Sequence, residues 1–481
     1  MLTTQPPPSD TDDTAQRMRW QRLTVAALAG HLVLAFYLVE RVGVNADEGW
    51  WLYAAGQVGR GLSLYTDVLF FQPPVMPHVY GGMLELGPGM LLGARWISLF
   101  FMVMAMGLMT LTVVRLAGLR TAALVVVLVG LHPMLVGVGV WAKPYALALF
   151  LLCGGLFLWS GASRPVRVVV GAMLFGLSAG VRLSLLPVPI LAIWAARHRS
   201  YAALGAVLGL SLAFRPLLGV APDVLWQQLI SVHLPASAEG WIPLRLMLLA
   251  RLGCLFAGIM AVLLCCQQRR VSMQDPLGRL CWGSVVSVGL LHLIPGALHV
   301  EHSVVLLPFL GVLAGLWVHH LPQKVWAWAL IAVATVGGWA TAITWAPFSV
   351  DSSDSTLSQV SKLGQSLRDE VPANRTLFTL QTTLAVEAGM SVPQGFEMGR
   401  FGWTLGVLSR DQVIYAMGGP VGAVALAEGD FANDPILRLA ITRAAERVGR
   451  TTEVMDFGQF SEPLLLGLPP APSQIHSQEA P

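Results

Sequence analysis

Residues 45–53 read Asn-Ala-Asp-Glu-Gly-Trp-Trp-Leu-Tyr, and they follow the first long apolar run of the chain, 23–39. Two adjacent acids, Asp47 and Glu48, therefore stand where a membrane helix would end. Acids at that position face water or take part in function, because desolvating a carboxylate is costly. Position alone favours solvated loop acids, with Glu48 stabilised by the N-terminal dipole of a following helix.

The composition indicates that lipid is the solvent of this chain. Of its 481 residues, 55% are hydrophobic and only 12% are charged, about half the charged share of a soluble domain. A soluble protein could not bury that much apolar surface. The chain also has no basic stretch interleaved with aromatic residues, so we expect no nucleic-acid partner.

Apolar runs of roughly 17–25 residues recur along the chain and predict about eleven transmembrane helices. The resulting all-α membrane domain would cover 22–345, after a disordered cytoplasmic N-terminus, 1–21. The expected spans are 22–40, 95–117, 121–141, 144–162, 166–182, 184–196, 201–219, 244–267, 279–297, 302–319 and 325–345.

The distribution of basic residues predicts the orientation of these spans. Alternate short loops are basic, which places them and the N-terminus in the cytoplasm. We therefore expect a multi-pass protein of the inner (plasma) membrane, in contact with its lipids, with the C-terminus outside. The basic loop residues are Arg115, Arg120, Arg164, Arg167, Arg197, Arg199, Arg269, Arg270, Arg279 and Lys324.

Two regions are expected on the outer side. The first outer loop, 41–94, contains two helix-like pieces, Glu48 to Val58 and Pro74 to Leu86. We expect these pieces to lie on the outer leaflet, since their aromatic side chains suit a membrane interface. These aromatic residues are Trp50, Trp51, Tyr53 and Tyr65.

The other outer region is 346–468, where the composition becomes polar. Its patterns predict helices at 351–370 and 434–448 and strands near 376–380, 421–426, 452–457 and 463–468. This small extracytoplasmic α/β domain would end in a flexible tail, 469–481. Its polar-aromatic segment 395–401 stands out. This segment either docks over the active site and helps to choose the acceptor or is a structural loop, and we favour the loop.

Four short elements in order change the interpretation of the first outer loop. They are Asp47-Glu48, Tyr65-Thr66-Asp67, Gln72-Pro73-Pro74 and Arg95 at the start of the second span. This succession resembles the polytopic glycosyltransferases of the C-type fold. It is most similar to the bacterial branch grouped with dolichyl-phosphate-mannose–protein mannosyltransferases and rhizobial lipid A core glycosyltransferases. The resemblance is good over 40–120 and looser to about 320.

The resemblance implies a sugar donor carried on polyprenyl phosphate and an acceptor on the outer side, whether lipid, glycan or protein. It also implies that Asp47 is the general base. Transfer with inversion requires one carboxylate to take the acceptor proton, and Glu48 would orient the acceptor or the base. The lipid phosphate leaves as an anion, so it needs cations rather than a general acid.

The expected substrate-binding residues follow from the same elements and from cations on the outer side. Lys143 and Arg182 break the positive-inside pattern, so they either clamp the lipid phosphate or extend toward lipid headgroups. Arg95 offers the same two alternatives, and for this residue we favour extension toward lipid headgroups. Asp67 either binds a substrate or caps a turn. From the resemblance, Tyr65, Gln72 and Arg95 complete the set.

A late His-Glu cluster provides a further candidate. The related proteins often carry His-Tyr-x-Leu-Pro entering a late span, and His302 matches its histidine, although Ser303 replaces the tyrosine. His302 would bind the donor phosphate or sugar. The sequence identifies no definite cofactor. His299, Glu301 and His302 could hold a divalent metal, but we favour that alternative less than a structural His-Glu cluster at the membrane interface.

Two other functional classes are weighed against an enzyme. A transporter or flippase is disfavoured because the charges gather at one membrane face, not at the midplane, and no internal repeat is found. A non-catalytic envelope assembly protein would use the outer α/β domain. The sequence therefore favours a bacterial, mannosyltransferase-like membrane enzyme of the cell envelope.

Overall fold

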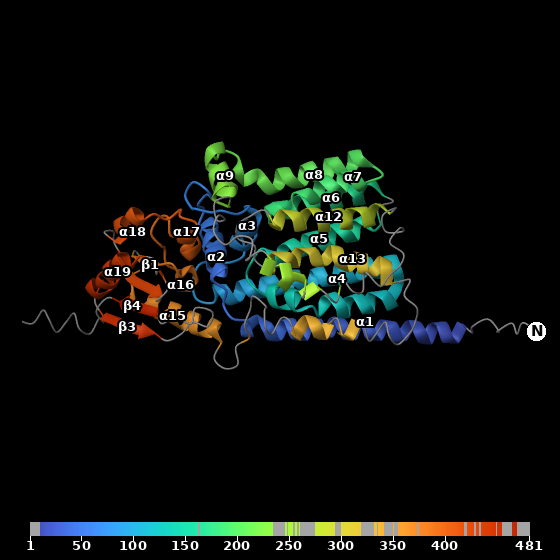
Figure 1. Cartoon of the computed structure of the whole chain (residues 1–481), viewed down its shortest axis with the longest axis horizontal. Coiled ribbons are helices and arrows are strands. Elements are labelled where there is room, and N and C mark those ends of the chain that lie inside the picture. The colour runs from blue at the N-terminus through green and yellow to red at the C-terminus, as the bar shows by residue number, and fades with distance from the viewer. Residues whose placement is uncertain are drawn as a thin grey trace, which may run out of the picture.

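The computed structural model describes residues 10–161, 164–233, 246–247, 249–253, 255–256, 259, 275–293, 300–318, 331–333, 335–340, 350, 355–372, 375–417, 421–427, 430–431, 434–448, 450–454 and 464–468. These residues form a helical domain and a smaller sheet domain at one end of it (Figure 1). The chain is a multi-pass membrane protein, and the long axes of its apolar helices run roughly parallel.

The helices of the membrane part coincide with the apolar runs. They are α1 (Asp10–Arg41), α4 (Met90–Val125), α5 (Tyr145–Trp159), α6 (Pro165–Ala179), α7 (Pro187–Ala195), α8 (Arg199–Phe214), α12 (Pro276–Leu293) and α13 (Leu307–Val318). Glycine marks close helix contacts: a Cβ on Gly205 would collide with the backbone of Val169. Close backbone approach is a common way to pack helices in lipid.

The expected count of eleven spans is not confirmed. Four helical stretches in the described part are long and apolar enough to cross a membrane: Thr14–Arg41, Met90–Gly130, Arg199–Leu217 and Val300–Trp317. Shorter apolar helices lie at Tyr145–Trp159, Pro165–Ala179, Leu183–Ala195 and Ile331–Ala340. The expected spans 244–267 and 325–345 fall largely outside the described residues.

Two expected spans, 95–117 and 121–141, form a helical hairpin that turns at Gly118, since a Cβ on Gly130 would meet Met106 and one on Gly139 would meet Met102. Gly118 interrupts α4 with a left-handed φ of 80°, which glycine adopts without strain. Two π-helical turns, Val126–Gly130 and Met134–Val138, then flank the pair His132-Pro133. Proline removes a helical hydrogen bond there, so the second of the two spans is interrupted at this pair.

The first outer loop contains the two expected helices, α2 (Ala46–Gly59) and α3 (Val75–Gly81). A capping box starts α2, since the Asn45 side chain accepts from the Asp47 amide and Glu48 accepts from the Asn45 amide. The expectation of lipid-facing aromatic residues was wrong. Their rings are buried within the protein, because α2 packs against α3 and the sheet domain. The rings concerned are those of Trp50, Trp51, Tyr53 and Tyr65.

The predicted α/β region folds as a four-stranded mixed sheet with helices. Strand β1 (Thr376–Thr379) pairs parallel with β2 (Val421–Ala427), and β4 (Leu464–Leu468) pairs antiparallel with both β2 and β3 (Arg450–Val454). The helices are α15 (Thr356–Glu370), α16 (Thr382–Ala388), α17 (Gly399–Thr404), α18 (Arg410–Met417) and α19 (Pro435–Val448). The strands, α15 and α19 overlap the predicted segments, whereas α16, α17 and α18 were not predicted. Helix α17 includes the end of segment 395–401, which we interpreted as a loop.

Polar contacts join the sheet domain to the first loop. Glu387 of α16 is fully buried, and its carboxylate accepts from the amides of Gly89 (2.8 Å) and Leu91 (2.7 Å) at the start of α4. It therefore caps a helix of the membrane part. The Tyr53 hydroxyl of α2 accepts from the Val392 amide at 3.1 Å. These bonds place α17 beside the first loop.

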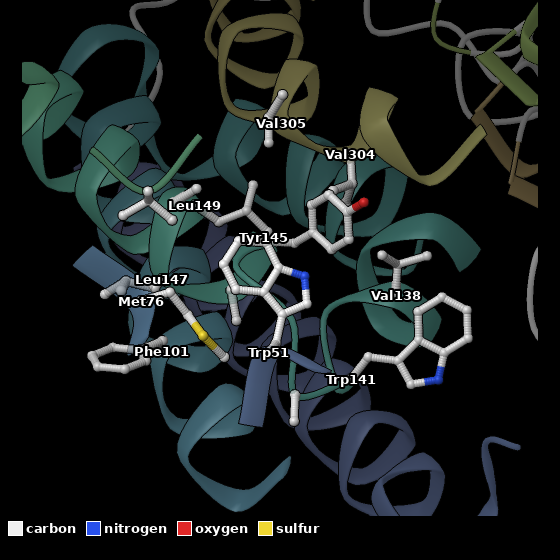
Figure 2. Close-up of a cluster of buried hydrophobic side chains, with 14 of the residues drawn as sticks. Trp51, Met76, Phe101, Val138, Trp141, Tyr145, Leu147, Leu149, Val304 and Val305 are labelled. Atoms are coloured by element: carbon white, nitrogen blue, oxygen red, sulfur yellow. The ribbon is translucent and has the colours of Figure 1, made fainter. Parts of the chain in front are cut away.

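An apolar cluster fills the space between the first loop and the membrane helices. Figure 2 shows Trp51 of α2 and Met76 of α3 lying near Phe101 of α4 and Tyr145 of α5, with Val304 next to the Tyr145 ring. All five side chains are buried. The first loop is therefore part of the protein core.

The pH dependence of stability is expected to depend on Glu397, which is 7% exposed. Burial raises the pKa of this carboxyl to about 7, although backbone amides of Glu397 and Gly395 oppose the change. The neutral form favours folding, so its contribution is present below about pH 4.5 and is lost as pH rises through 7. Glu397→Gln should increase the free energy of unfolding at pH 8 by on the order of 3 kcal/mol.

Thermal unfolding of the purified full chain between pH 4 and 8 checks this. Glu85→Gln, which changes an exposed carboxylate, is the control and should keep the wild-type profile. A Glu397→Gln profile that parallels the wild-type one would contradict the prediction.

Candidate functional site

The Asp47 carboxylate lies in the first turn of α2 and is the exposed member of the acidic pair. Its side chain is 38% exposed. One oxygen accepts from Lys143 Nζ at 2.8 Å, and the other accepts from Trp50 Nε1 at 3.2 Å. These two donors fix the carboxylate while leaving part of it open to a ligand.

Lys143 lies between two carboxylates. Its ammonium is 1% exposed and contacts Asp47 at 2.8 Å and Glu301 at 2.6 Å. Burial alone would lower the pKa of Lys143, but the two carboxylates raise it above its ordinary value. The ammonium is therefore held charged. Glu301 belongs to a 3₁₀ segment, Val300–Leu306, and also accepts from the Tyr145 hydroxyl at 3.5 Å.

Glu48, the neighbour of Asp47, points away from solvent and pairs with Arg95. Both side chains are fully buried. Arg95 donates to Glu48 from Nε (2.9 Å) and Nη2 (2.7 Å), a bidentate geometry. Its remaining donors bond to the carbonyls of Val39, Val42 and Gly43 at the end of α1. All five guanidinium donors are therefore used.

The Glu48 carboxylate is equally saturated. Besides Arg95, it accepts from the amides of Asn45 (3.0 Å) and Ala142 (2.8 Å). Glu48 follows Asp47 in the chain, and Ala142 precedes Lys143. One buried carboxylate therefore fixes the backbone on both sides of the Asp47–Lys143 ion pair.

A cavity of about 360 Å³ opens beside Asp47. The first loop, the adjacent ends of the membrane helices and the sheet domain all contribute to its wall. Five of the predicted site residues line it: Asp47, Gln72, Lys143, Arg182 and His302. Most of the remaining wall is apolar or aromatic.

Arg182 supplies a second cation to the cavity. It follows α6 and is 8% exposed, with its guanidinium 4.8 Å above the Tyr145 ring. Its Nε–H has no hydrogen-bond partner among the described residues. A buried donor without a partner is rare, so this group is available to an anionic ligand. His302 lies nearby, its ring 5.6 Å from that of His292.

Four predicted site residues do not line the cavity. Glu48 and Arg95 use their hydrogen-bonding groups on each other and on nearby backbone. We therefore infer that they position the site and do not contact a ligand. The Tyr65 hydroxyl donates to the Gln72 carbonyl at 2.7 Å and so holds a cavity residue. Asp67 accepts from the Ser63 amide at 2.8 Å in an exposed turn, as the capping alternative expects.

The structure adds residues that the sequence did not single out as ligand contacts. Tyr145, His233, His292 and Phe401 line the cavity. Phe401, on α17 of the sheet domain, stacks on Trp50 with centroids 5.9 Å apart and planes 8° apart. His233 donates to the Phe71 carbonyl at 2.9 Å. Burial and Arg182 lower the pKa of His233, so its ring is neutral.

The contribution of Phe401 had one signal in the sequence, the polar-aromatic segment 395–401. The other new contacts come from segments far apart in the chain. For the metal alternative, His299 lies outside the described residues, and Glu301 is engaged by Lys143. Within the described part, no group of three or more suitable side chains is arranged to hold a metal ion.

Comparisons with solved structures show the fold. The chain is similar to ArnT from Cupriavidus metallidurans bound to undecaprenyl phosphate, with a TM-score of 0.64, 15% identity, and coverage of 92% of this chain and 98% of that one. The apo state of ArnT gives a TM-score of 0.61 at 14% identity, covering 92% and 97%. The apo oligosaccharyltransferase of Archaeoglobus fulgidus gives 0.51 at 10%, covering 87% and 71%.

No protein-family model and no curated protein sequence matches the chain. The likeness to ArnT nevertheless confirms a mostly helical, multi-span fold with a small mixed sheet near the C-terminus. The C-type glycosyltransferase fold expected from the four sequence elements is thus supported by structures. The nearer resemblance to protein mannosyltransferases and the bacterial assignment stay predictions, as does the side of the membrane on which the site lies.

Removal of Arg95 should strongly destabilise the protein. Arg95→Met leaves Glu48 buried without a counter-ion, which costs about 3–5 kcal/mol. The double variant Glu48→Gln/Arg95→Met should recover part of that loss, because no buried charge is left unpaired. Denaturant unfolding in mixed micelles measures both effects.

Arg60→Met is the control for this comparison, because Arg60 is exposed and bonds only to the Gly389 carbonyl in the described structure. We expect it to change stability by less than about 1 kcal/mol. Wild-type stability of Arg95→Met would show that the pair does not hold the site.

Proposed function

We propose that the protein is a membrane glycosyltransferase that moves a sugar from a polyprenyl-phosphate donor to an acceptor of the cell envelope. The observation that carries the proposal is one partly exposed carboxylate, Asp47, facing a cavity that also holds Lys143 and Arg182. The ArnT fold supports it, since the ArnT of the comparison is bound to undecaprenyl phosphate.

The residues have the charges that the reaction needs. In our proposal Asp47 accepts the proton of an acceptor hydroxyl while the oxygen of that hydroxyl attacks the anomeric carbon. The bond from that carbon to the phosphate oxygen breaks, and polyprenyl phosphate leaves with the electron pair. Attack from the opposite face inverts the configuration. The leaving phosphate needs fixed positive charge and no general acid.

Lys143 and Arg182 are the proposed source of that charge. An ammonium has three donors, and Lys143 uses two of them on Asp47 and Glu301. The third remains for a phosphate oxygen. Arg182 offers its unpartnered Nε–H, and His302 lies on the same wall. Glu301 would act as a positioning residue, because it keeps the ammonium of Lys143 in place.

The rest of the cavity suits the other parts of the substrates. Aromatic rings at its wall offer flat apolar surfaces for a sugar ring or a prenyl unit. Phe401 and Leu405 come from the sheet domain. We therefore propose that this domain helps to select the acceptor, whether a lipid, a glycan or a protein.

Replacement of Asp47 tests the enzyme proposal. Asp47→Asn removes the base but keeps the shape, so transfer should fall by about 10²–10⁴-fold. Asp67→Asn is the matched control, an acid of the same loop that lies outside the cavity, and it should stay within a few-fold of wild type. Mass spectrometry of envelope glycans and polyprenyl phosphates from cells carrying each variant gives the readout.

Both variants must be inserted at wild-type level for the comparison to hold. A glycan profile that is unchanged by Asp47→Asn would sink the general-base role. A profile that does not change when the whole gene is deleted would sink the glycosyltransferase function and favour a transporter or an assembly protein.

Arg182 is expected to control lipid-phosphate binding. Arg182→Gln removes a charge-assisted contact, so the Kd for undecaprenyl phosphate should rise about 10- to 100-fold. Native mass spectrometry with added undecaprenyl phosphate measures this, with Arg60→Gln as the exposed control. Equal affinity of wild type and Arg182→Gln would exclude Arg182 from the phosphate site without touching the role of Asp47.

A further inference from the structure

A second cavity, of about 260 Å³, lies at the opposite end of the membrane helices. We call it the distal cavity. Leu116 of α4, Trp159 at the end of α5 and Leu277 at the start of α12 form its apolar wall. Its polar lining comes from Arg197 and His198, between α7 and α8, from Ser160 and from Asp275 just before α12.

Arginines surround this cavity. Arg197 lines it. Arg115 donates to Ser160 Oγ at 3.2 Å, and Arg167 donates to the Gly161 carbonyl at 3.2 Å. A side chain at Gly161 would collide with both of these guanidinium groups, so they converge on the same rim.

A fourth arginine, Arg279 of α12, is close to the lining in sequence but does not itself line the cavity. Arg279 lies two residues beyond the lining residue Leu277, and its guanidinium stacks 5.5 Å from the Trp194 ring. Its Nε–H is buried without a partner among the described residues. Such a donor normally has an acceptor, so this N–H is available to donate to a ligand.

In the described structure, the four arginines in and near the distal cavity outnumber its one lining acid, Asp275. No ion pair in the described structure involves any of the four arginines. Asp275 is the acid among the lining residues, and its carboxylate already accepts from the Gly278 amide at 3.4 Å, where it caps α12. The site therefore favours an anion.

The surface around the distal cavity is apolar and open. Within three residues of its lining lie large side chains with exposed fractions of 71% (Val166), 52% (Trp194) and 41% (Tyr201). An anion with hydrocarbon tails would place its tails on these side chains. A small soluble anion would leave them without a role in binding.

We propose that the distal cavity binds the phosphate headgroup of an anionic glycerophospholipid from the leaflet at that end of the protein. Basic pockets between membrane helices bind such headgroups. The ligand would join the ends of α4 and α5 to the start of α12 and to the α7–α8 turn. It differs in place and in chemical role from the polyprenyl-phosphate donor, and it does not depend on the proposed reaction.

The test compares thermal unfolding of the full chain in nanodiscs of phosphatidylcholine with and without phosphatidylglycerol. A ligand that binds the folded state raises the Tm, here by on the order of 2 °C. Arg197→Gln should remove this rise. Ala196→Phe should also remove it, because it fills the cavity and keeps every charge.

Arg120→Gln is the matched control. Arg120 lies at the same end but stacks on Trp20, outside the distal cavity, so this variant should retain the rise. If Ala196→Phe does not fold, the test is the comparison of the Tm rise in Arg197→Gln with that in Arg120→Gln.

Three results would overturn the proposal. The first is no response of the wild type to phosphatidylglycerol. The second is an equal response of wild type and folded Ala196→Phe, or of Arg197→Gln and Arg120→Gln, which would indicate diffuse attraction to a charged bilayer. The third is an equal rise when glycerol phosphate or inorganic phosphate is added to phosphatidylcholine nanodiscs, which would identify a soluble phosphate as the ligand.

Discussion

A fully buried carboxylate and guanidinium, Glu48 and Arg95, organise the functional end of this protein. Each is tolerated away from water only because every lone pair and every N–H has a partner. Those partners lie on α1, on the start of α2 and on the segment before α5. The pair thus converts three separate pieces of chain into one rigid support, and the Asp47–Lys143 contact rests on it.

The different environments of the neighbouring acids Asp47 and Glu48 follow from that support. Glu48 faces inward and is saturated, whereas Asp47 faces the cavity and keeps part of its surface open. The capping box at Asn45 sets the direction of α2 and hence which acid faces which way. A change of helix register by one residue would put Glu48 in the place of Asp47 and would leave Arg95 facing Gly49 without its carboxylate partner.

Local patterns predicted much of the fold but only part of the site. Apolar runs located α1, α5 and α6, because such runs depend only on nearby residues. Helix α2, which carries Trp50, packs against α16 more than 300 residues away, and no local pattern reports such a contact. The same holds for Glu301 beside Lys143 and for Phe401 beside Trp50.

The cap that Glu387 places on α4 has a consequence for how this architecture can vary. Two amides at the beginning of a membrane helix obtain their acceptor from a domain that follows about 300 residues later. Exchange of that domain with one from a distant relative would leave those amides without an acceptor unless the incoming domain brought an equivalent acid. A chimera of such proteins should therefore take the start of α4 and the acid that caps it from the same parent.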